Sequence, residues 1–166
     1  MRHLARVHPA GAHGRAEGEE LTRFCTHCAA LFDGPAPGGA PHRGRVCGRC
    51  GLGVVLACSS ATLTAPGASF LVVTADLRVS AASEPAEDLF KVPDGLYGRP
   101  LLSLLTSAAG VGEMARIVVR AANGTLAPST VTVEAASSAV AAGKLEARIG
   151  GCGNPPAALV VVEVAG

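Results

Sequence analysis

The sequence CTHC at residues 25–28, followed after eighteen intervening residues by CGRCG at residues 47–51, organises the N-terminal third of the chain. A gap of two residues lets both sulfurs of a pair face the same metal ion, and Gly48 and Gly51 give the second turn backbone freedom. Four thiolates at this spacing are typical of one tetrahedral zinc ion. Because four cysteines fill the tetrahedron and leave no position for water, we expect a structural zinc site. Its ligands would be Cys25, Cys28, Cys47 and Cys50.

Two disulfide bonds, or four ordinary buried thiols, are the alternatives to a metal. Disulfides need an oxidising compartment, and residues 1–11 contain no apolar run long enough for a secretory signal. Zinc is preferred over an iron–sulfur cluster, and His27 or His42 would be needed as ligands only if a cysteine were replaced. Cys58 and Cys152 lie outside this set. In a reducing compartment we expect them to be small buried hydrophobic residues rather than a redox pair.

Composition argues against electrostatic binding to nucleic acid or to a membrane surface, and against a membrane-spanning segment in this chain. The 166 residues include 14 Lys and Arg against 13 Asp and Glu, a net charge of +1, which gives no global attraction to nucleic acid or to a membrane surface. The longest apolar runs, residues 54–58 and 157–162, are far shorter than a membrane span. We therefore expect a soluble, cytoplasmic protein without membrane contact.

The chain divides into four segments. Residues 1–20 show neither helical nor strand periodicity and are expected to form a flexible N-terminal arm. Residues 21–58 hold the four cysteines, with a proline- and glycine-rich loop between the pairs and an apolar strand after the second pair, a pattern that resembles a zinc ribbon. A treble clef is the alternative. Residues 59–67, which end in Pro66-Gly67, predict a linker to a domain over residues 68–165.

The sequence pattern predicts the order of strands and helices in the domain over residues 68–165. Residues 70–74 and 77–81 predict a hairpin, and Ser83 followed by Pro85 predicts the start of a short helix that ends at Phe90. Leucines within residues 101–105 predict another short helix, and residues 113–122 predict the longest helix from their i, i+3, i+4, i+7 apolar spacing. Residues 129–135, 144–149 and 157–164 predict three strands. The order is two strands, several short helices and three strands.

A resemblance to a known family lies in three stretches, residues 70–83, Leu89-Phe90 and residues 98–105. Through them the segment over residues 68–165 resembles the PAS domain. The resemblance implies an α+β fold, a PAS-like five-stranded antiparallel sheet with short helices on one face, preceded here by a small N-terminal zinc ribbon. Ser83 stands where the family usually has asparagine, and Lys91 where it often has glycine. Profilin-like and GAF-like folds with the same element order are the alternatives.

The resemblance implies a domain that binds a small ligand or pairs with another domain. Haem in domains of this family commonly has a histidine axial ligand, and all five histidines here lie at or before His42, outside the PAS-like residues, so we expect no haem. Flavin-based light sensing in the family depends on a cysteine in a short polar helical motif. Neither Cys58 nor Cys152 lies in such a motif, so we expect no flavin. With 3% aromatic residues, a flat cofactor would find few stacking partners. A small apolar ligand, or none, is the expectation.

We expect a non-catalytic sensory or protein-interaction module, a small regulatory adaptor that works through a protein partner or as a homodimer. No catalytic constellation and no phosphate-binding glycine loop followed by lysine is recognisable, so we expect no enzyme. The alternative is a nucleic-acid-binding regulator that acts through the zinc ribbon. It rests on Arg43, Arg45 and Arg49 around the second cysteine pair, a weak footprint of three charges without an aromatic platform.

Overall fold

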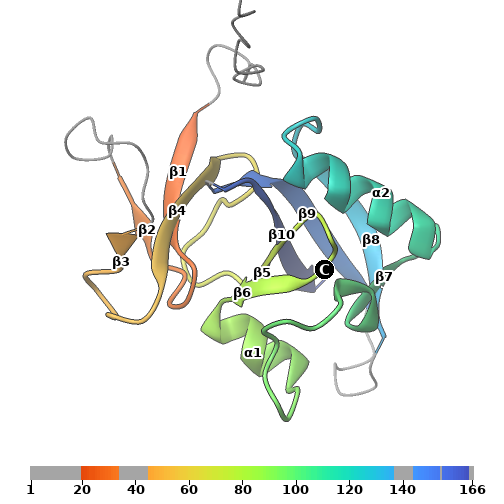
Figure 1. Ribbon diagram of the computed structural model, residues 1–166, viewed down its shortest axis with the longest axis horizontal. Coiled ribbons are helices and arrows are strands. Elements are labelled where there is room, and N and C mark those ends of the chain that lie inside the picture. The colour runs from red at the N-terminus through yellow and green to blue at the C-terminus, as the bar shows by residue number, and fades with distance from the viewer. Residues whose placement is uncertain (1–19, 34–44, 137–143, 154, 165–166) are drawn as a thin grey trace, which may run out of the picture.

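The computed structural model describes residues 20–33, 45–136, 144–153 and 155–164, and within these ranges the protein is mostly antiparallel β-sheet (Figure 1). The helices are α1 (Glu84–Phe90), α2 (Val111–Ala122) and a 3-10 helix, η1 (Leu101–Ser103). The described strands are β1 (Leu21–Cys25), β2 (Leu31–Phe32), β3 (Arg45–Val46), β4 (Val54–Ser59), β5 (Phe70–Val73), β6 (Val79–Ala82), β7 (Leu105–Ser107), β8 (Ser129–Ala135), β9 (Leu145–Cys152) and β10 (Ala157–Val164). The expected arm over residues 1–20 lies almost wholly outside the described residues, as does most of the expected loop between the cysteine pairs.

All the described strands belong to one branched sheet, whose main path runs β2-β1-β4-β9-β10-β5-β6. One edge of β9 pairs with β10 along its whole length. The other edge is shared: β8 pairs with residues 145–149 of β9, and β4 meets Cys152. β7 extends the β8 branch. Because two strands leave the same edge of β9 in different directions, the sheet curls, with β1 and β4 at the left of Figure 1 and α2 at the upper right.

This architecture overturns the expected PAS-like five-stranded sheet with a separate zinc ribbon. The strands of the four-cysteine segment are hydrogen-bonded into the same sheet as the later strands, β7 adds another strand, and the described residues contain two α-helices rather than several. The leucine segment shows one cause. Its helix stops at Ser103, and the fully buried Leu105 begins β7 opposite Ala135, because pairing with β8 outweighs a short local helical preference. The boundaries at residues 20, 58 and 67 stay a prediction.

The individual helices and strands after residue 68 agree better with the sequence-based predictions than the architecture does. Hairpin β5–β6, helix α2 and strands β8 and β10 lie where the patterns placed them, whereas β9 covers the expected residues from 145 on but continues beyond residue 149 to Cys152. Ser83 caps α1 as predicted, and its hydroxyl is fully used: it accepts from the N–H groups of Ala86 and Phe70 and donates to the Ala68 carbonyl. Lys91 ends this helix in the left-handed region, with φ of 48°, a conformation that glycine adopts at lower cost.

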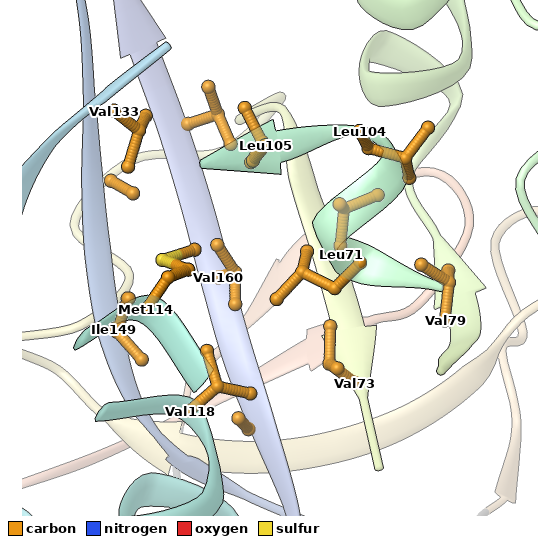
Figure 2. Close-up of a cluster of buried hydrophobic side chains, with 14 of the residues drawn as sticks. Leu71, Val73, Val79, Leu104, Leu105, Met114, Val118, Val133, Ile149 and Val160 are labelled. Atoms are coloured by element: carbon orange, nitrogen blue, oxygen red, sulfur yellow. The ribbon is translucent and has the colours of Figure 1, made fainter. Parts of the chain in front are cut away.

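The central strands β5 and β10 are buried on both faces, which explains why the cysteine segment joins the fold. Alternate residues of a strand point to opposite faces. Leu71 and Val73 of β5 belong to a core cluster beneath the helices, and Figure 2 shows Met114 and Val118 of α2 beside Val160 of β10 in that cluster. Residues of the other face, among them Phe70, Val72, Leu159 and Val161, form a second cluster with Phe24 and Cys58 from β1 and β4. A helical layer on one face alone would leave this second cluster in water.

Candidate metal centre

Two turns bring the four cysteines together. Cys25 is the last residue of β1 and Cys28 lies in the turn that follows it. Cys47 comes directly after β3 and Cys50 lies in the turn before β4. Because β1 and β3 both pair with β4, antiparallel pairing brings the two turns to the same end of the sheet. The strand expected after the second cysteine pair is present as β4.

The sulfur atoms have the separations that a single ion requires. Cys25 Sγ lies 3.6 Å from Cys50 Sγ, Cys28 Sγ lies 4.0 Å from Cys47 Sγ, and all four sulfurs lie within 4.8 Å of one another. A tetrahedral zinc ion with Zn–S bonds of about 2.3 Å places its sulfurs about 3.8 Å apart. The four cysteines therefore can hold a metal ion. His27 is not part of this group, and His42 lies outside the described residues.

Backbone N–H groups point at the sulfurs in the same way in both turns. The N–H of His27 donates to Cys25 Sγ and the N–H of Arg49 donates to Cys47 Sγ, each at 3.4 Å. Each donor lies two residues after the first cysteine of its pair, so the two turns repeat one local geometry. Such donors orient sulfur ligands and stabilise their negative charge.

The thiols differ in how readily they ionise. Burial raises the pKa of the Cys25 thiol to about 12. Hydrogen bonds from the backbone N–H groups of Gly53 and Leu52 lower the pKa of Cys50 to about 6. Of these two thiols, Cys50 is the one that the backbone favours as a thiolate, the form in which cysteine binds a metal ion.

Gly53 is the site residue that the sequence reading missed. A Cβ there would lie 2.4 Å from Cys25 Sγ and 2.8 Å from the backbone nitrogen of His27, so the turn closes only around a residue without a side chain. Its carbonyl accepts from the N–H of Cys47 at 2.7 Å, which closes the turn that carries the second cysteine pair. Of the two glycines named from the sequence, Gly51 does adopt a left-handed φ of 71°, whereas Gly48 does not. A glycine three residues beyond the last cysteine was the available signal.

The centre is anchored to the rest of the fold at several points. The His27 carbonyl accepts from the N–H of Glu84, the first residue of α1, at 2.8 Å. The Ala29 carbonyl accepts from the N–H of Gly67 at 3.1 Å. Phe24 of β1 meets Phe70 of β5 edge to face, with ring centroids 5.2 Å apart and an interplanar angle of 83°. These contacts position the cysteine turns against α1 and the hairpin β5–β6.

The arginines named from the sequence are only partly visible. Arg49 is exposed in the second turn, the backbone of Arg45 belongs to β3, and Arg43 lies outside the described residues. Among the described residues, no helix combines the length and the apolar character that crossing a bilayer requires.

The class of protein that these observations define is a mainly antiparallel β-sheet protein with a four-cysteine centre at one end of its sheet. No family model matches the chain, and neither the curated proteins nor the solved structures include a match. The resemblance to the PAS domain stays a prediction.

Proposed function

We propose that the four cysteines bind one structural zinc ion and that the protein is a non-catalytic interaction module of the cytoplasm. The metal proposal rests on the four sulfurs, which lie within 4.8 Å of one another. In each turn a backbone N–H is also directed at the first cysteine. Zinc is favoured because four thiolates in a tetrahedral arrangement suit it, and a reducing compartment keeps such thiolates available.

A structural role is favoured over a catalytic one by the ligand set and by its surroundings. Four cysteines complete a tetrahedron, so a bound ion would have no open position for water or substrate. Two of the ligands, Cys25 and Cys47, are almost fully buried. The ion would hold the turn after β1 against the turn before β4, and through the His27 carbonyl it would also hold the start of α1.

Protein interaction is supported by exposed apolar residues next to this centre, which we call the apolar tip: Val46, Leu52 and Val54. Val46 and Val54 are directly opposite each other on β3 and β4, so their side chains share one face. They are 69% and 39% exposed, and Leu52 in the adjoining turn is 76% exposed. Exposed apolar residues grouped in this way are typical of a contact surface. The occupant would be a protein partner or a second copy of the chain.

Metal content tests the first part of the proposal. Elemental analysis of the purified chain is expected to give about one zinc per chain. Replacement of Cys47 and Cys50 by serine should abolish it, whereas the same replacement at Cys58, which lies outside the centre, should leave it unchanged. A metal-free wild-type chain that keeps its fold would refute the proposal.

Native mass spectrometry tests the interaction role, because it reports metal, retained ligand and oligomer together. A dimer or a co-purified protein that is lost in Leu52→Asp would support the apolar tip, and a retained small apolar ligand would support a sensory role. Titration with mixed DNA and RNA at low salt tests the nucleic-acid alternative, since electrostatic binding is strongest there. Binding that disappears in Arg49→Ala would favour that alternative over protein interaction.

A further inference from the structure

The two cysteines outside the metal centre are brought together by the sheet. Cys58 ends the apolar part of β4 and Cys152 is the last residue of β9, 94 positions further along the chain. They are directly opposite each other, and in the described part of the chain theirs is the one register pair between β4 and β9. Sequence reasoning treated them as unrelated buried residues, because nothing in the local sequence relates the two strands.

The type of strand pairing sets the separation of the two side chains. The N–H of Gly153 donates to the carbonyl of Ala57 at 3.0 Å, one residue along each strand from the cysteines. Cys58 and Cys152 therefore form the narrow, non-hydrogen-bonded type of antiparallel pair, with Cα atoms about 4.5 Å apart and side chains on the same face. Disulfides join cysteines whose Cα atoms are about 4.4–6.8 Å apart. The backbone thus holds the two sulfurs within bonding reach.

The pair lies inside the second core cluster, between the cysteine segment and the central strands. Cys58 is 0% exposed and Cys152 is 2% exposed, with Phe24 and Leu159 in the same cluster. Bulk oxidants and reductants reach this position only when β4 moves away from β9. A bond formed there would be slow to appear and slow to be reduced.

We propose that Cys58 and Cys152 are an oxidation site, at which a disulfide bond covalently joins the four-cysteine segment to the central sheet. With hydrogen peroxide as oxidant, one cysteine sulfur attacks a peroxide oxygen, the O–O bond breaks, and a sulfenic acid and one water are formed. The second sulfur then attacks the sulfenic sulfur, and its proton leaves with the hydroxyl group as a second water. Two thiols are oxidised by two electrons in total, and one peroxide is reduced to two waters.

The bond would lock the fold at the point where its two halves meet. It closes a loop that includes strands β5 to β9 and both α-helices, and disulfides that close long loops restrict the unfolded chain most. For a chain of this size we expect the midpoint of thermal unfolding to rise by roughly 10 °C on oxidation. The inference does not rest on the metal proposal, because the pair is separate from the four-cysteine centre.

The test uses the full chain, with zinc added to protect the four-cysteine centre, and hydrogen peroxide as the probe. After oxidation the thiols are alkylated, the chain is digested without reduction, and the peptides are identified by mass spectrometry. We expect one cross-linked peptide that contains Cys58 and Cys152, together with a rise in the unfolding midpoint that a thiol reductant reverses.

The variants Cys58→Ser and Cys152→Ser should lose both signals. If either folds poorly, the peptide map of the wild-type chain decides by itself. Oxidation that produces sulfinic acid at either cysteine, or cross-links that involve only the four cysteines of the centre, would overturn the proposal. A cross-link between Cys58 and Cys152 of two different chains, seen as a covalent dimer, would overturn it as well.

Discussion

Replacement of Gly53 by alanine tests whether the turn around the cysteine centre is as tightly closed as its geometry indicates. The added Cβ would lie 2.4 Å from Cys25 Sγ and 2.8 Å from both the backbone nitrogen and the Cβ of His27. Non-bonded heavy atoms are most stable at about 3.5–4.0 Å, so the sulfur would have to move by about 1 Å. The turn cannot simply retreat, because the His27 carbonyl is held by the N–H of Glu84.

The expected magnitude follows from this displacement. Metal–sulfur distances in a working site vary by only about 0.2 Å, far less than the shift that the methyl group demands. Overpacking of this kind costs about 1–3 kcal/mol. Since about 1.4 kcal/mol corresponds to a factor of ten in an equilibrium constant, zinc affinity should fall roughly 10- to 100-fold.

The assay is competition for zinc against a chromophoric chelator at fixed pH. Gly48→Ala is the matched control: it adds the same methyl group within the second cysteine pair, nothing lies within 4 Å of its Cβ, and its φ is not left-handed. The control should bind zinc like the wild type. Wild-type affinity in Gly53→Ala, or an equal loss in Gly48→Ala, would refute the steric argument.

Three further perturbations probe the fold around the centre. Phe24→Ala should lower the free energy of unfolding by about 3–5 kcal/mol in urea titrations, because the ring is fully buried against Phe70, whereas Leu21→Ala on the same strand, 47% exposed, should cost far less. Lys91→Gly should stabilise the protein by about 1 kcal/mol by relieving the left-handed backbone, and Lys91→Ala, which keeps a Cβ, should give no such gain. The third concerns Glu113, whose pKa is lowered from its ordinary 4.5 by the hydrogen bonds and charge of Arg116. Because the folded-state pKa is the lower one, the stabilisation is present above pH 4.5 and is lost as the pH falls through the depressed value. Urea midpoints that fall equally in wild type and Glu113→Gln over this range would contradict that assignment.

The candidate centre was largely predictable because its signal is local. Two residues between paired cysteines suffice to bring two sulfurs to one side of a turn, and the four named ligands do lie together. Gly53 was not predictable in the same way. Its need for a bare backbone arises from the approach of Cys25 and His27, which are more than twenty residues away in sequence. Steric conflicts between distant segments leave no periodic trace.

The prediction of the fold class was wrong for a related reason. Alternating and valine-rich patterns located hairpin β5–β6 and the three C-terminal strands, and helical spacing located α2. The structure buries the apolar runs at residues 70–73 and 157–162 on both faces, and periodicity cannot say what covers a face. Leu105 shows the limit in one residue, because its place in β7 depends on the edge that β8 offers.

The sequence by itself therefore indicated the two cysteine pairs of the candidate centre, the cap at Ser83 and the position of most strands and of α2, since each signal lies in residues close together in the chain. Only the tertiary structure decided that β1 and β4 join the central sheet, that Phe24 packs on Phe70, and that Cys58 faces Cys152. These contacts are made because burial of the second apolar face of β5 and β10 is favourable. Many segments of suitable shape could have covered that face. Which segment does so is settled by packing of the whole chain, including the two turns that carry the cysteines.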